Sequence, residues 1–105
     1  MKPAQKRNIP TLLFCGKEAQ HLNISEHSTD ISSREMTKIS TYLYGNTIIA
    51  ASPGIEYCVA CNEVAGSGSW STDGEWEWSD CLFHYISSHD LEMPECFRRK
   101  IINSN

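Results

Sequence analysis

The sequence feature that most constrains the fold is a tight turn that lies between the first tryptophan of the chain and the other two. The tryptophans are Trp70, Trp76 and Trp78. The dipeptide at residues 73–74 is Asp-Gly, which favours a short hairpin turn because both residue types tolerate positive φ. Such a turn pairs residue 71 with Trp76. Trp76 and Trp78 then share the core face of the hairpin, and Trp70 lies on the other face, exposed or half-buried.

A strand-like pattern precedes this hairpin. Residues 39–44 alternate in polarity and are rich in β-branched and aromatic side chains, which predicts a strand. Gly-Asn at 45–46 predicts a two-residue turn, so residues 47–51 are expected to return as its partner. Residues 55–59 are expected to form the third strand of a meander, and residues 11–15 a separate short strand.

Two capping patterns predict helices. Ser32 and Glu35 have the spacing of a capping box, which predicts a single helical turn at residues 33–37. Ser79 or Asp80 can cap a second helix that follows the tryptophan hairpin.

A short final helix is expected after Pro94, which suits a first helical position, with Phe97 and Ile101 as apolar anchors four residues apart. The expected elements give an α+β fold: a small antiparallel meander and a Trp-rich hairpin packed on one or two short helices. Residues 36–105 are expected to form this single domain. Residues 1–35 are expected to be an N-terminal extension, partly disordered.

Four cysteine and histidine residues have the spacing of a zinc site. Cys58, Cys61, Cys81 and His84 form C-x2-C-x19-C-x2-H. Cys81 and His84 would project from one face of the first helical turn, so the four could close a tetrahedral structural site in a treble-clef-like module. His89 is an alternative ligand. It lies about 140° around a regular helix from His84, so both can ligate only if the helix ends or tightens there. The other interpretation is that the thiols are ordinary packed side chains.

The hairpin and the segment after it carry a recurring pattern. The residues concerned are Thr72–Trp78, Leu82, His84-Tyr85, His89, Pro94 and Phe97. They resemble the motif T-D-G-x-W-x-W…L-x-H-Y…H…P-x-x-F of an uncharacterised family of small bacterial proteins. The chain departs from that motif at Ser79, where proline is usual, and at Cys81, where glycine is usual. The resemblance names no activity. It implies that the tryptophan pair and the His84-Tyr85 pair contribute to the fold or to a shared surface.

Net charge, hydrophobicity and cysteine content limit the classes of protein to which the chain can belong. The chain has 105 residues and a net charge of -4, which disfavours nucleic acid as a partner because phosphates select basic surfaces. The apolar run at residues 11–15 is too short for a signal peptide or a membrane span. Five cysteines without a secretion signal indicate a cytoplasmic protein whose thiols are reduced or bound to metal.

These observations favour a small non-enzymatic binding protein, with one structural zinc ion if the thiols bind metal. Its protein partner and its oligomeric state stay open. Trp70 and Tyr85 are the candidate partner-binding residues, because tryptophan and tyrosine are common interface anchors. Two alternatives remain. One is a small enzyme with Cys81 as nucleophile beside His84. The other is a zinc-stabilised nucleic-acid-binding module.

Overall fold

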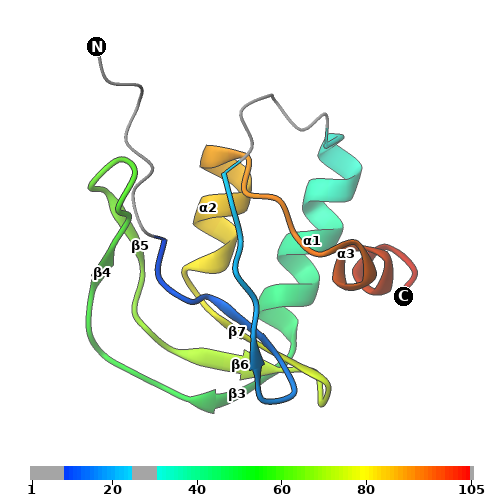
Figure 1. Cartoon of the computed structure of the whole chain (residues 1–105), viewed down its shortest axis with the longest axis horizontal. Helices are drawn as coiled ribbons and strands as arrows, with labels where there is room; N and C mark the ends of the chain where they lie inside the picture. Colours follow the sequence, from blue (N-terminus) through cyan, green and yellow to red (C-terminus); the bar gives the residue numbers. More distant parts are fainter. Residues whose placement is uncertain (1–8, 25–30, 105) are drawn as a thin grey trace.

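The computed structural model describes residues 9–24 and 31–104. Its elements in chain order are β1 (Leu13–Cys15), β2 (Glu18–Ala19), α1 (Ser33–Gly45), β3 (Thr47–Ala50), β4 (Glu56–Tyr57), β5 (Val64–Gly66), β6 (Trp70–Thr72), β7 (Trp76–Ser79), α2 (Leu82–His89) and α3 (Glu95–Ile102). Five strands form an antiparallel sheet in the order β2-β1-β7-β6-β3, and β4 and β5 pair separately. The helices lie on one side of the sheet (Figure 1). The predicted α+β fold class is confirmed.

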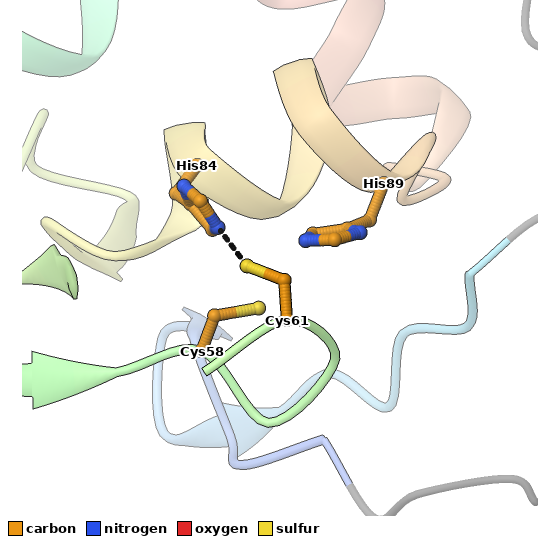
Figure 2. A group of neighbouring side chains, drawn as sticks. All are labelled: Cys58, Cys61, His84 and His89. Atoms are coloured by element: carbon orange, nitrogen blue, oxygen red, sulfur yellow. Dashed lines mark hydrogen bonds between the residues drawn. The ribbon is translucent and has the colours of Figure 1, made fainter. Parts of the chain in front are cut away.

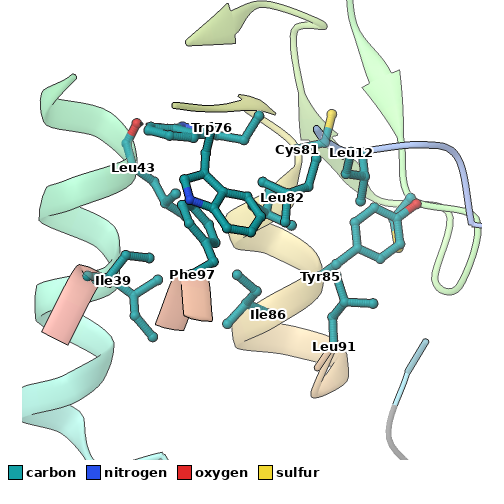
Figure 3. Close-up of a cluster of buried hydrophobic side chains, with 14 residues drawn as sticks. Leu12, Ile39, Leu43, Trp76, Cys81, Leu82, Tyr85, Ile86, Leu91 and Phe97 are labelled. Carbon is teal, nitrogen blue, oxygen red and sulfur yellow. Dashed lines mark hydrogen bonds between the residues drawn. The ribbon is translucent and has the colours of Figure 1, made fainter. Parts of the chain in front are cut away.

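The tryptophan hairpin forms the centre of the core. Trp76 and Trp78 on β7 are buried, as predicted, and the ring of Phe97 from α3 lies against both, with centroid separations of 4.7 and 5.6 Å. The Trp78 indole Nε1 donates a hydrogen bond of 3.0 Å to the Leu43 carbonyl at the end of α1. Strand and helices therefore meet at one aromatic cluster (Figure 3).

The hairpin register differs from the prediction by two residues. Ser71 pairs with Trp78 rather than with Trp76. Asp73 causes the difference, because its Oδ1 accepts hydrogen bonds from the amides of Glu75 and Trp76, at 2.9 and 2.7 Å, and so lengthens the loop. A shift by an even number of residues leaves every side chain on its predicted face.

The strand predicted over residues 39–44 is wrong, because these residues belong to α1. Ser32 caps this helix, its Oγ accepting from the Glu35 amide at 3.1 Å, so the predicted cap is confirmed and only the helix length was underestimated. Ile39 and Leu43 lie one turn apart and are both buried against the core. This packing stabilises a helix that local β propensity opposes.

The predicted meander is therefore also wrong. Residues 47–50 do form a strand, β3, but with residues 39–44 helical it pairs with β6 instead. Asn46 ends α1 rather than turning a hairpin. Within the segment predicted as a third strand, only Glu56–Tyr57 is extended in a ladder, and it pairs with β5.

The N-terminal strand is central rather than peripheral. β1 falls within the predicted segment 11–15 and lies between β2 and β7, with Leu13 fully buried. The domain boundary expected between residues 35 and 36 falls inside α1. Residues 13–15 and 18–19, which were expected to lie in an extension, belong to the same sheet as the tryptophan hairpin. Residues 1–8 and 25–30 of the expected extension lie outside the described residues.

The last two helices match their predicted positions. The N-cap residue of α2 is Cys81 rather than the predicted Ser79 or Asp80, and the Cys81 amide donates to the Ser79 Oγ at 3.1 Å. Pro94 directly precedes α3, and Phe97 and Ile101 are both fully buried. The point where α2 ends, at His89, decides the geometry of the site described next.

Candidate metal centre

The first two metal-ligand candidates lie in a tight turn between β4 and β5. The Cys58 amide donates to the Glu63 carbonyl at 2.8 Å, and the Asn62 amide donates to the Cys58 carbonyl at 2.8 Å. Asn62 has a φ of 67°, a left-handed conformation that asparagine tolerates. These bonds curl the chain so that the side chains of Cys58 and Cys61 face the same side (Figure 2).

The other two candidates come from α2. A regular helix would separate His84 and His89 by about 140°. The helix ends at His89, however, because Asp90 adopts a left-handed conformation with a φ of 53°. The amides of Asp90 and Leu91 both donate to the Tyr85 carbonyl. At this helix end the two imidazole rings have a centroid separation of 5.2 Å.

The four side chains converge on one point. One donor atom from each of Cys58, Cys61, His84 and His89 lies within 4.8 Å of all the others. The Cys61 Sγ is 3.4 Å from the His84 Nε2. Tetrahedral zinc, with bonds of about 2.0–2.3 Å, separates its donors by about 3.3–3.8 Å, so a small contraction of the cluster would complete a site.

An unpaired nitrogen supports this interpretation. The His89 Nε2 is buried and has no hydrogen-bond partner among the residues that the structure describes. Buried polar atoms are nearly always paired, so an orphan of this kind needs an explanation, and an ion is one. Two thiolates and two imidazoles are the donor set of structural zinc sites.

The electrostatics of the cluster suit metal binding. Burial, and then the neighbouring His89, lower the pKa of His84, so its ring stays neutral as a ligand must be. A backbone hydrogen bond involving Glu63 would lower the pKa of Cys61, but burial and the adjacent Cys58 thiol raise it overall. The charge of a bound cation would reverse that and keep both thiols ionised.

Cys81, predicted from the sequence as the third ligand, does not join the group. It is buried at the start of α2, where its Sγ lies 3.8 Å from the Asp80 Oδ1, and burial raises its pKa. The structure brings Cys58, Cys61 and His84 together with His89, the alternative fourth ligand. The C-x2-H spacing alone could not reveal this, because the choice depends on where α2 ends.

The two candidate partner-binding residues lie in different surroundings. Trp70 is half-buried on β6, on the sheet face opposite the core, with its ring 5.6 Å from that of Phe14. Tyr85 is only 1% exposed, and its hydroxyl accepts a hydrogen bond of 2.9 Å from the Val59 amide. Tyr85 therefore supports the turn that carries the two cysteines, a role that no pattern in the sequence indicates.

Asp80 connects this region to the tryptophan hairpin. Its carboxylate accepts hydrogen bonds from the amides of Ser67 and Gly68, at 3.0–3.1 Å, and from the Ser67 hydroxyl at 2.6 Å. A Cβ added at Gly66 would lie 2.6 Å from the Asp80 Oδ1, so the loop needs glycine there. Burial alone would raise the pKa of Asp80, but the hydrogen bonds from Ser67 and Gly68 outweigh it and lower the pKa.

Asp80→Asn is expected to lower the free energy of unfolding by about 1–3 kcal/mol at pH 7, because the amide accepts fewer and weaker hydrogen bonds. A carboxyl with a lowered folded-state pKa contributes its stability above the unfolded-state pKa of about 3.9 and loses it as pH falls through the folded value. Urea unfolding at pH 7 and near pH 2.5 should therefore show the difference from wild type shrinking in acid. Glu92→Gln, at an exposed position, is the control. An undiminished difference in acid would contradict the proposed role of the carboxylate.

Comparison with known proteins adds no further constraint. Within the described residues, no helix combines the length and the apolar character needed to cross a membrane. No family model, curated protein or solved structure matches the chain. The resemblance to the small bacterial family thus stays a prediction. The candidate site therefore rests on its geometry alone, that of a Cys/His cluster able to hold a metal ion.

Proposed function

We propose that this protein is a zinc-stabilised interaction module. In it Cys58, Cys61, His84 and His89 hold one structural zinc ion, and the protein acts by binding a protein partner rather than by catalysis. One observation carries the proposal: four donor atoms from two separate elements lie within 4.8 Å of one another. The ion would tie the β4–β5 turn to α2.

The donor set favours a structural role for the ion. Four protein ligands fill a tetrahedral shell, whereas catalytic zinc sites keep one position for water or substrate. The alternative of a cysteine-dependent enzyme has little support, because burial raises the pKa of Cys81 and disfavours the reactive thiolate. Its Sγ lies 3.8 Å from the Asp80 Oδ1, and the carboxylate disfavours a second negative charge there.

Exposed apolar side chains support a binding role. Large apolar residues with more than a third of their surface exposed are Ile24, Tyr44, Ile48, Ile49, Ile55, Tyr57 and Val64. Two of them lie on the edge strand β3, and two others lie on the β4–β5 hairpin next to the metal cluster. Apolar surface of this kind on a small protein often marks a contact with a partner.

The metal content of untagged, full-length protein tests the zinc site. Elemental analysis is expected to give about one zinc per chain for the wild type and for Cys81→Ser, and none for Cys58→Ser or His89→Ala. Cys81→Ser is the matched control, since it removes a neighbouring buried thiol outside the cluster. Retention of zinc by His89→Ala together with its loss from Cys81→Ser would refute the ligand assignment. A zinc-free wild type after refolding with the metal would refute the site altogether.

A further inference from the structure

A pocket of about 180 Å³ lies beside the metal cluster, between the N-terminal strand segment, β4 and the start of α2. The lining residues that matter for binding are Glu56, Tyr57, Gly68, Trp70 and Tyr85. Pockets for drug-sized molecules measure about 300–1,000 Å³, so this one fits a single long side chain rather than a cofactor. Both residues that the sequence marked as partner-binding candidates, Trp70 and Tyr85, line it.

The lining combines aromatic rings with one negative charge. Tyr57 and Trp70 are exposed and half-buried, respectively, so their rings are accessible to a ligand. Glu56 is the one charged residue among the described residues that line the pocket, and it forms no ion pair with another described residue. Aromatic faces beside an unpaired carboxylate attract a cation.

The backbone helps to keep this carboxylate at the pocket. A Cβ added at Gly68 would lie 3.3 Å from the Glu56 Oε2, so the absence of a side chain there gives the carboxylate its room. Gly68 has a φ of 91°, which side-chain-bearing residues rarely adopt. The Asp80 carboxylate accepts a hydrogen bond of 3.0 Å from the Gly68 amide, so a second acidic side chain contacts this backbone segment.

We propose that this pocket binds an arginine side chain from a basic segment of a partner protein. A guanidinium can stack on the Trp70 ring while its planar donors pair with the Glu56 carboxylate, a combination that lysine matches less well. The acidity of the whole chain, with a net charge of -4, complements a basic partner. This inference deepens the interaction role proposed above and depends on it.

The metal cluster would pre-form the pocket. Glu56 and Tyr57 directly precede Cys58 in sequence, and Tyr85 contacts both the pocket and the cysteine-bearing turn. A zinc ion that fixes this turn to α2 therefore also fixes the two β4 side chains. Ordering them before binding reduces the entropy lost when the partner docks.

The test is a titration of the zinc-loaded, full-length protein with end-blocked Gly-Ser-Arg-Ser-Gly, followed by two-dimensional NMR. The Trp70 indole and the Gly68 amide signals are expected to shift in a saturable manner. A peptide with citrulline, the uncharged isostere of arginine, should give no such shifts, and a lysine peptide should bind more weakly. Glu56→Gln is expected to weaken binding about fivefold, and Trp70→Leu about tenfold.

Glu92→Gln is the matched control, because it removes an exposed carboxylate that does not line the pocket. Equal binding of arginine and citrulline peptides, equal binding by Glu56→Gln, or absence of shifts at the pocket would overturn the inference. The zinc content of the same samples separates the two proposals. Zinc-loaded protein that does not bind the arginine peptide refutes the pocket proposal alone. Protein that stays zinc-free after refolding with the metal, but still binds the peptide, refutes the metal centre alone.

Discussion

Phe97→Ala is expected to lower the free energy of unfolding by about 3–5 kcal/mol, as truncation of a fully buried aromatic residue does. The Phe97 ring contacts Trp76, Trp78 and Tyr42, with centroid separations of 4.7, 5.6 and 6.4 Å. Its removal would leave a cavity where β7, α1 and α3 meet. Domains of this size have total stabilities of about 5–15 kcal/mol, so the variant would be marginal. Urea unfolding followed by tryptophan fluorescence measures the change.

Phe83→Ala serves as the control for this substitution. Phe83 lies on α2, is only half-buried and contacts the exposed ring of Tyr44. Its truncation should therefore lower the free energy of unfolding by less than half as much as Phe97→Ala does. Phe97→Leu keeps most of the apolar volume, so its loss in free energy of unfolding should fall between those of the two alanine variants. It also keeps the comparison measurable if Phe97→Ala does not fold. Equal losses for Phe97→Ala and Phe83→Ala would show that the aromatic cluster is not the centre of the core.

Removal of zinc is expected to lower the melting temperature by about 10–20 °C. A ligand that binds only the folded state at 100 times its dissociation constant contributes about 2.7 kcal/mol. In a domain of this size each kcal/mol corresponds to about 4–8 °C. The melting temperature of zinc-loaded protein, measured with and without excess EDTA, gives the shift directly.

Variants identify the origin of that shift. Cys58→Ser should melt near the temperature of the chelated wild type and should not respond to EDTA. Cys81→Ser should keep the full response, because its thiol lies outside the cluster. A response to EDTA that survives in Cys58→Ser would mean that the chelator acts elsewhere on the molecule.

Local patterns predicted the elements whose own side chains determine them. The Asp73-Gly74 turn, the Ser32 cap and the Phe97–Ile101 anchors all lie where the sequence placed them. Residues 39–44 were wrongly predicted to be a strand. Their alternating pattern of β-branched and aromatic residues also places Ile39 and Leu43 one helical turn apart, so the pattern fits a helix as well. The choice between helix and strand was made by burial against α3 and β7, which are distant in sequence.

The candidate site was predictable in part, for a similar reason. Spacing alone identified Cys58, Cys61 and His84, because a C-x2-C pair and a later histidine are recognisable in any sequence. The fourth donor, His89, is the last residue of α2, directly before the left-handed residue Asp90 that ends the helix. No spacing rule encodes such a helix end. The pocket beside the site was not predictable either, since it assembles from segments far apart in the sequence, residues 10–12 and several stretches between residues 56 and 85.

The central position of β1 affects how the chain can fold during synthesis. Cys15 pairs with Trp76, so β1 finds this partner only after about 60 further residues have been synthesised. At about 5–20 residues per second, Leu13 and its neighbours wait several seconds without the core that will bury them. Contacts this distant in sequence close slowly even once both strands are present. The nascent protein therefore depends on whatever shields that apolar strand in the interval, and a slowed ribosome would lengthen its exposure.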